Sequence, residues 1–328
     1  MKKFRWGVIG TGMIAKVVCK EIVKSGRHEI AAVYSRTYER AHKFAKKYGA
    51  KCYSDLEEML SDKDVDAVYI ATPHSVHYSN LIACINAGKP AFAEKAFTVN
   101  AAQAERVFNL AKEKKVLVCE AMWTRFQPVV LEVAEAVERG EIGEIKSFRG
   151  GFSTPATWVK PFLSDRLFKP EYAGGALLDV GVYPISFSHM LLGVPDVVEC
   201  RAKLENGIDM NDDILLKYAC GAVCSLTCTL EGLKSFTGVI EGENGKIIIP
   251  NYSRPKKATV YGEDGSVKRV IKGNKGYIYE FDAFADSVRR GETECVFMTG
   301  KDTVEVMNIM DECRKKTGLS YPENIERL

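Results

Sequence analysis

Hydrophobic positions in the first 120 residues alternate between short apolar runs and longer stretches with the periodicity of one helix face. The apolar runs predict strands at 4–10, 29–35, 66–72, 90–94 and 116–120. The periodic stretches between them predict helices at 13–26, 38–49, 54–60, 76–88 and 100–115. Apolar strands that alternate with helices are typical of a parallel sheet covered on both faces. We therefore predict an α/β fold that begins with a doubly wound parallel sheet over residues 1–121.

The pattern changes after Glu120. Helical periodicity recurs at 129–140, 175–193, 279–291 and 301–318. The intervening stretch 197–271 has the pattern of successive strands joined by short polar turns. Residues 122–328 are therefore predicted to form an α+β domain with a mostly antiparallel, open sheet and helices on one face.

Composition and charge exclude several classes of protein. The chain has 328 residues, 46% of them hydrophobic, which is enough for two packed domains. Its 46 basic and 43 acidic residues give a net charge of +3 with no dense basic block, so we expect no nucleic-acid partner. The N-terminal stretch has the start of a signal peptide, but Arg5, Lys16 and Lys20 interrupt its apolar character. We expect a cytoplasmic protein without a membrane segment.

Cysteines and histidines provide weak metal signals only. The ten cysteines form no disulfide-scaffold pattern. Cys220, Cys224 and Cys228 share the parity of one strand face, which favours a buried face of small residues over a metal site. His74 and His77 could pair on zinc, but no third ligand converges with them in the sequence. We expect no metal site.

The turn after the first predicted strand carries a nucleotide-binding motif. Gly10, Gly12 and Ala15 form G-x-G-x-x-A between a strand and a helix. The glycines permit a tight turn and a close approach to a pyrophosphate, and the alanine permits close packing of helix on sheet. A purely structural turn is the alternative, which the surrounding strand–helix alternation disfavours. The motif predicts a dinucleotide-binding Rossmann domain whose cofactor contacts Gly10, Thr11, Gly12, Met13, Ile14 and Ala15.

The end of the second strand indicates which dinucleotide binds. An NAD site usually offers Asp or Glu to the ribose hydroxyls, but here the chain has Ser35, Arg36 and Arg40, with no acid before Glu39. A hydroxyl and guanidinium groups can hydrogen-bond a ribose phosphate, which a carboxylate would repel. NADP is therefore favoured and NAD remains possible. The alternative for the two arginines is a solvated helix start.

Glu94 and Lys95 place two opposite charges at the end of the predicted buried strand 90–94. In an open parallel sheet, ligands bind beyond the carboxyl ends of the strands, so these two side chains should border the nicotinamide. The predicted strand 66–72 ends at the same edge, so the residues after it are also predicted to contact the cofactor: Thr72, Pro73, His74 and His77. For His74, an ordinary loop position is the alternative.

The second half supplies a proton-transfer partner. Asp179 and Tyr183 are four residues apart, so they share one face of a helix, and Gly174 and Gly175 before them allow a close backbone approach. Hydride removal from an alcohol requires a group that accepts the hydroxyl proton, and a phenol can do so if its pKa of about 10 falls. A cation at ~4 Å contributes about 4 kcal/mol, or roughly three pKa units, before desolvation opposes it. Lys95 is the candidate cation.

These motifs together resemble the Gfo/Idh/MocA oxidoreductases. The resemblance rests on "GVIGTGMIA", "ATPHSVH", "AGKPAFAEKAFTVNAAQAE" and "GGALLDVGVYP" and covers nearly the whole chain. With "EAMWTRFQP", the chain is most similar to the dimeric dihydrodiol dehydrogenases and the NADP-dependent D-xylose 1-dehydrogenases. The resemblance implies that Lys95 and Tyr183 are the catalytic pair, although many members have His at the tyrosine position. Ala96 replaces the proline of the family signature, which removes the fixed φ that helps to aim the lysine.

The resemblance also implies the surroundings of the substrate and the assembly. Asp179 joins the catalytic pair, and Trp123, Arg125 and Phe152 are expected around the substrate; a core position for Phe152 and a structural ion pair for Arg125 are the alternatives. A homodimer or higher homo-oligomer is expected through the C-terminal sheet.

Two functions follow as hypotheses. The first is an NADP-dependent dehydrogenase that transfers hydride between nicotinamide and a ring carbon bearing a hydroxyl, in a sugar, a cyclic polyol or a trans-dihydrodiol. Tyr183 is its acid/base, assisted by Lys95. The second is a catalytically weak NADP(H)-binding sensor, which Ala96 favours slightly. The retained Lys95, Asp179 and Tyr183 argue against it, because a sensor needs no proton acceptor beside the nicotinamide.

Overall fold

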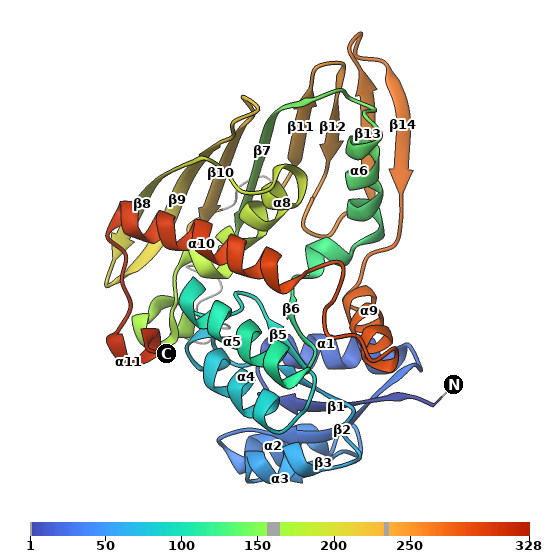
Figure 1. Cartoon of the computed structure of the whole chain (residues 1–328), viewed down its shortest axis with the longest axis vertical. Helices are drawn as coiled ribbons and strands as arrows, with labels where there is room; N and C mark the ends of the chain where they lie inside the picture. The colour runs from blue at the N-terminus through green and yellow to red at the C-terminus, as the bar shows by residue number, and fades with distance from the viewer. Residues whose placement is uncertain (1, 156–164, 233–235) are drawn as a thin grey trace.

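The N-terminal part of the chain folds around a six-stranded parallel sheet. The computed structural model describes residues 2–155, 165–232 and 236–328 (Figure 1). The strand order is β3-β2-β1-β4-β5-β6, and every neighbouring pair is parallel. The strands are β1 (Phe4–Ile9), β2 (His28–Tyr34), β3 (Lys51–Tyr53), β4 (Ala67–Ile70), β5 (Ala91–Glu94) and β6 (Val118–Ala121). The predicted doubly wound parallel sheet is confirmed.

Helices connect these strands as the periodicity predicts. They are α1 (Met13–Lys24), α2 (Tyr38–Ala45), α3 (Leu56–Ser61), α4 (His77–Asn86) and α5 (Ala101–Lys114). Strands β4, β5 and β6 are buried at every position, which explains their uninterrupted apolar sequence. The carboxyl ends of β1, β4 and β5 therefore meet at one edge of the sheet, where a ligand can approach.

The second sheet has eight strands in the order β14-β13-β12-β11-β7-β10-β9-β8. It is antiparallel except for the parallel pair β7 and β10. Its strands are β7 (Ile145–Ser153), β8 (Val197–Glu205), β9 (Ile208–Lys217), β10 (Val223–Thr229), β11 (Gly238–Gly242), β12 (Gly245–Ile249), β13 (Lys257–Gly262) and β14 (Val267–Lys272). This is the predicted, mostly antiparallel sheet.

Three helices lie along one face of the second sheet (Figure 1): α6 (Pro128–Glu138), α8 (Val182–Leu192) and α10 (Gly300–Thr317). Helix α10 also packs on α5 and so joins the two sheets into one body. A short helix, α11 (Glu323–Glu326), follows it near the C-terminus.

Helix α9 (Ile278–Arg289) belongs to the C-terminal half of the sequence but packs on the N-terminal sheet. Phe281 lies 4.9 Å from Trp6 and 5.2 Å from Phe92 between ring centroids, and Phe284 lies 4.8 Å from Phe92. These buried aromatic side chains bring the first turn of α9 to the edge where the parallel strands end.

The predicted helix 175–193 is not uniform. Residues Leu177–Gly181 form one wide π-helical turn, and the regular helix α8 continues from Val182. The stretch Pro170–Leu192 is long and apolar enough to cross a membrane, but 83% of its most apolar window is buried inside the protein. It is therefore a core helix, which explains why its polar members Asp179 and Tyr183 are so deeply enclosed.

The cysteine prediction is correct in part. Cys224 and Cys228 are buried on β10, as the shared parity predicts. Cys220, however, lies in the turn before the strand and is exposed, because the strand begins only at Val223. All ten cysteines are free thiols.

Candidate active site

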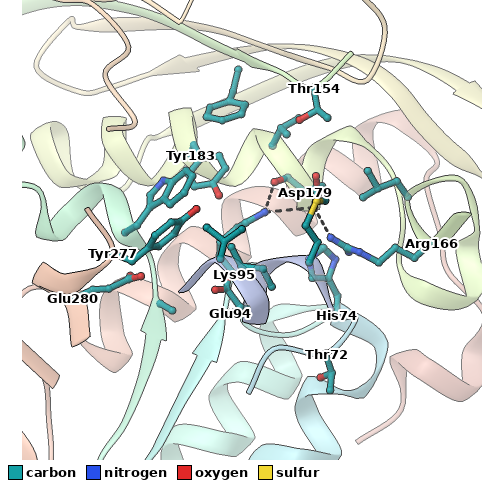
Figure 2. Close-up of a pocket in the computed structure, with 18 residues that line it drawn as sticks. Thr72, His74, Glu94, Lys95, Thr154, Arg166, Asp179, Tyr183, Tyr277 and Glu280 are labelled. Carbon is teal, nitrogen blue, oxygen red and sulfur yellow. Dashed lines mark hydrogen bonds and ion pairs between the residues drawn. The ribbon is translucent and has the colours of Figure 1, made fainter. Parts of the chain in front are cut away.

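A cavity of about 330 Å³ lies where the carboxyl ends of the parallel strands meet the core helix and α9 (Figure 2). Ten of the predicted site residues line it: Met13, Ile14, Thr72, His74, Glu94, Lys95, Trp123, Phe152, Asp179 and Tyr183. They come from segments that are far apart in the sequence, so the fold assembles the site rather than any one motif.

Lys95 and Asp179 form the charged centre of the cavity. Lys95 follows β5, and its Nζ donates to the backbone oxygen of Asp179 at 2.5 Å and lies 3.4 Å from Asp179 Oδ1. Arg166 Nη2 lies 3.4 Å from the same carboxylate oxygen on its other side (Figure 2). Burial alone would raise the pKa of Asp179, but Lys95 and Arg166 outweigh it and lower that pKa to about 2. Asp179 is therefore ionised although its residue is only 8% exposed.

Tyr183 stands in an aromatic stack. Its ring centroid lies 4.6 Å from that of Phe152 and 5.4 Å from that of Trp123, with nearly parallel planes. Lys95 Nζ lies over the ring, 4.9 Å from its centroid. Burial raises the pKa of Tyr183 well above its ordinary value, and the charges of Glu94 and of Asp179 raise it further. The expected lowering by Lys95 is therefore absent in this structure, because the ammonium bonds Asp179 and faces the ring while the hydroxyl is desolvated.

Two further buried carboxyls, those of Glu94 and Glu280, line the cavity. Glu94 accepts a hydrogen bond of 2.5 Å from the Tyr69 hydroxyl, and burial raises the pKa of Glu94. Glu280, in the first turn of α9, is 1% exposed, and burial raises its pKa well above the ordinary range. Tyr277 also lines the cavity, with the Arg254 guanidinium 5.0 Å from its ring centroid. Burial thus raises the pKa values of Glu94 and Glu280, whereas Lys95 and Arg166 keep that of Asp179 low.

The two histidines separate into different roles. His74 lines the cavity and is buried, and burial together with Arg166 lowers its pKa to about 3, so its ring is neutral. His77 does not line the cavity. Its Nε2 lies 2.8 Å from the Thr72 backbone oxygen and its Nδ1 3.0 Å from that of Ala96, so it holds two strand-end loops together. Within the described ranges, no group of three or more His, Cys, Asp or Glu residues is arranged to hold a metal ion.

Arg125 lies outside the cavity. It is 4% exposed, and its Nη1 lies 3.2 Å from Asp302 Oδ1. Its Nε donates to Ser186 Oγ at 3.0 Å, and its Nη2 lies 2.7 Å from His189 Nδ1. The guanidinium is therefore held by buried partners and does not line the cavity, which corresponds to the structural ion pair given above as the alternative.

The predicted nucleotide-binding turn has the required backbone geometry. Gly10 has φ +98°, and a Cβ there would lie 2.6 Å from the Ala71 backbone oxygen, so only glycine fits. Gly12 directly precedes α1, whose first turn carries no acidic residue, and Ala15 is buried against the sheet. Thr11 lies between the two glycines. The first turn of α1 therefore presents backbone amides that suit a diphosphate.

The residues beyond β2 also fit a phosphate. Ser35 is half-buried, whereas Arg36 and Arg40 are exposed. Neither guanidinium has an ion-pair partner in the part of the chain that the structure describes. Pro73 connects the end of β4 to the 3₁₀ turn His74–Val76. Ala96, in the position of the signature proline, follows a cis peptide bond.

Four polar residues of the cavity lining are not among the residues predicted from the sequence: Thr154, Arg166, Tyr277 and Glu280. Arg166 precedes the "GGALLDVGVYP" segment by only a few residues, so a charge near that motif was a usable signal. Glu280 and Tyr277 reach the site only because α9 packs on the other sheet, which the local pattern does not reveal.

Family models match both parts of the chain. The model of the GFO/IDH/MocA oxidoreductase family with an NAD-binding Rossmann fold matches residues 4–122, and the GFO/IDH/MocA C-terminal domain model matches residues 130–268.

Individual proteins match nearly the whole chain. D-xylose 1-dehydrogenase (NADP(+)) of Hypocrea jecorina is 32% identical, over 98% of this chain and 94% of that protein. Trans-1,2-dihydrobenzene-1,2-diol dehydrogenase of Mus musculus is 29% identical, over 98% of each chain. The structure of KijD10, a 3-ketoreductase from Actinomadura kijaniata in complex with NADP and TDP-benzene, has a TM-score of 0.85 at 27% identity, over 96% of this chain and 98% of that chain.

Proposed function

Because the chain belongs to the GFO/IDH/MocA oxidoreductase family and is an NAD(P)-dependent dehydrogenase, we propose that it transfers hydride between NADP and a ring carbon that bears a hydroxyl. The substrate class is a sugar, a cyclic polyol or a trans-dihydrodiol. The observation that carries the proposal is the gathering of Lys95, Asp179 and Tyr183 around one cavity at the carboxyl ends of the parallel strands. That place is where an open parallel sheet binds its ligand.

The chain's own groups suit an NADP cofactor. The backbone amides after Gly10 and Gly12 suit the diphosphate, and the exposed Arg36 and Arg40 with Ser35 suit the ribose phosphate. When bound, the cofactor supplies the hydride acceptor or, in its reduced form, the donor. The cavity beyond the first turn of α1 is then left for the substrate ring.

Tyr183 is proposed to hold the proton that moves to or from the substrate oxygen. Because its pKa lies above the ordinary value, the phenol is protonated near neutral pH, which is the form that donates a proton to a carbonyl. This form suits reduction of a ketone or lactone. For oxidation, we propose that Lys95 turns from the Asp179 backbone oxygen towards the phenol oxygen and there stabilises the phenolate.

Asp179 and the aromatic side chains are proposed to orient the substrate. A carboxylate that stays ionised between Lys95 and Arg166 can accept a hydrogen bond from a hydroxyl next to the reacting carbon. Trp123 and Phe152 present apolar ring faces beside Tyr183, which suit the face of a sugar or aryl ring. Together these groups fix which ring carbon faces the hydride.

The first test measures reduced-nicotinamide absorbance with purified protein, using NADP and NAD in turn. The substrate panel holds aldoses, inositols and aromatic trans-dihydrodiols, and the corresponding ketones and lactones with NADPH. We expect turnover of one class with NADP. Tight NADPH binding without turnover of any panel member would favour the sensor hypothesis instead.

We also propose that the protein is cytoplasmic and forms a homodimer or higher homo-oligomer through the second sheet. Val197 and Leu204 on β8, and Val267 and Val270 on β14, are exposed hydrophobic side chains. Light scattering on the purified protein measures the mass of the particle. A monomer at micromolar concentration would contradict the proposed assembly but not the proposed reaction.

A further inference from the structure

Glu280 is a buried carboxyl that the proposed proton transfer does not use. It lines the cavity from the first turn of α9, and its Oε2 has no hydrogen-bond partner among the described residues. A buried polar atom without a partner costs free energy that native structures usually avoid. An orphaned carboxyl oxygen on a residue that lines a cavity therefore points to a ligand group that completes its bonding.

The position of Glu280 indicates which ligand this is. Glu21, on α1, accepts hydrogen bonds from the backbone nitrogens of Tyr277 at 2.6 Å and Ile278 at 3.2 Å, so the start of α9 is fixed to α1. Helix α1 begins at the nucleotide-binding turn, and its residues Met13, Ile14 and Val17 line the same cavity. Glu280 thus faces the space between the nucleotide-binding helix and the end of β5, beside Glu94 (Figure 2).

The chemistry of the carboxyl narrows the ligand further. Burial, with the charges of Glu94 and Glu21, raises the pKa of Glu280 well above its ordinary value, which favours the protonated carboxyl. A neutral carboxyl offers one donor and one acceptor side by side. A primary carboxamide offers the complementary acceptor and donor in the same arrangement.

We infer that Glu280 holds the carboxamide of the nicotinamide ring through paired hydrogen bonds and thereby sets which face of the ring meets the substrate. This inference rests on the proposed use of NADP. It makes Glu280 a residue for nicotinamide positioning, distinct from the residues that hold the diphosphate and the ribose phosphate. In Figure 2 the carboxyl lies on the side of the cavity opposite to Arg166.

Calorimetric titration separates the nicotinamide from the rest of the cofactor. NADPH is compared with 2′-phospho-ADP-ribose, which lacks the nicotinamide, in the wild-type protein and in two variants. Glu280→Leu removes both hydrogen bonds. We expect it to weaken the affinity for NADPH about tenfold and to leave the affinity for 2′-phospho-ADP-ribose unchanged. Glu280→Gln is the matched control, because its amide keeps one donor and one acceptor, and it should bind NADPH almost as tightly as wild type does.

A second measurement needs no variant. The 3-acetylpyridine analogue of NADP has a methyl group where the carboxamide has its amino group, so wild type should bind it several-fold more weakly than NADP, by the loss of one hydrogen bond. Equal binding of the two would overturn the inference. The inference would also be overturned if Glu280→Leu lost affinity equally for NADPH and for 2′-phospho-ADP-ribose, or if this variant raised the substrate KM without any change in NADPH affinity. If neither nucleotide binds the wild-type protein, the proposed use of NADP fails instead.

Discussion

Replacing Tyr183 by Phe removes one hydroxyl and leaves the aromatic stack in place. The ring still lies 4.6 Å from Phe152 and 5.4 Å from Trp123 between centroids, so packing and stability should change by less than about 1 kcal/mol. If the phenol is the proton donor, its loss should lower kcat by about 10² to 10⁴, which is ~3 to 5 kcal/mol of barrier. NADPH affinity should remain near that of wild type, because no part of the nucleotide-binding turn is altered.

Tyr277→Phe is the matched control for this change. Tyr277 lines the same cavity and is also a buried phenol with a raised pKa, but it lies at the start of α9 with Glu280. Both variants are assayed by steady-state oxidation of NADPH with the best carbonyl substrate, and by calorimetric titration with NADPH. Tyr277→Phe should retain most of the turnover. A Tyr183→Phe enzyme with kcat within about threefold of wild type would refute the reasoning, as would a larger loss in Tyr277→Phe.

The raised pKa of Tyr183 adds a pH test to the same prediction. Since burial moves the pKa of this phenol above its ordinary value of about 10, the group should stay protonated from roughly pH 6 to 9. The reductive kcat/KM should therefore show no falling limb from Tyr183 within that range. A limb near neutral pH that disappears in Tyr183→Phe would mean that the cofactor complex lowers this pKa far more than the structure indicates.

Three other changes probe separate parts of the site. Arg166→Leu removes one of the two cations beside Asp179. At 3.4 Å the attraction between Arg166 and Asp179 is ~5 kcal/mol at a dielectric of 20, and solvent screening of the partly exposed arginine reduces it to about 1 to 2 kcal/mol. We therefore expect kcat/KM to fall about tenfold in Arg166→Leu and to recover most of its value in Arg166→Lys. Gly10→Ala places a Cβ against the Ala71 backbone oxygen at φ +98°, so thermal melting should show a loss of about 1 to 3 kcal/mol and NADPH binding should weaken; an unchanged melting temperature and affinity would contradict the assigned turn. Arg36→Ala should reduce the preference for NADP over NAD about tenfold in kcat/KM, and an unchanged preference would remove Arg36 from the phosphate site.

Much of this site could be predicted from the sequence, because its first half follows local rules. Each strand of the parallel sheet is a continuous apolar run, and the residues directly after such runs must lie at one edge. That rule alone predicts that Glu94, Lys95 and Thr72 lie at the site. The oxidoreductase family and the NADP cofactor were also correctly predicted from the motifs.

The remaining features depend on contacts between distant segments, which a local pattern cannot specify. Arg125 has the sequence position of a substrate contact, but Asp302 near the C-terminus neutralises it in the interior. Whether a charged side chain faces a cavity or a buried partner depends on where that partner's helix packs. The same limit applies to Glu280, whose helix is directed onto the first sheet by Phe281 and Phe284 rather than by any feature of its own polar residues.

The arrangement of charge in the cavity explains why two opposite charges follow a buried strand. Lys95 extends from the strand end to Asp179 and, with Arg166, keeps that carboxylate ionised near Tyr183, the proposed proton carrier. Glu94, one residue earlier, accepts the hydrogen bond from Tyr69 instead, and burial raises its pKa as it does that of Glu280. Full negative charges beside the nicotinamide would bind a ring whose charge changes during hydride transfer very unequally in its two states. In the proposed placement, the carboxyls whose pKa values burial raises lie beside the nicotinamide and the ionised Asp179 lies beside the substrate, which reduces that inequality.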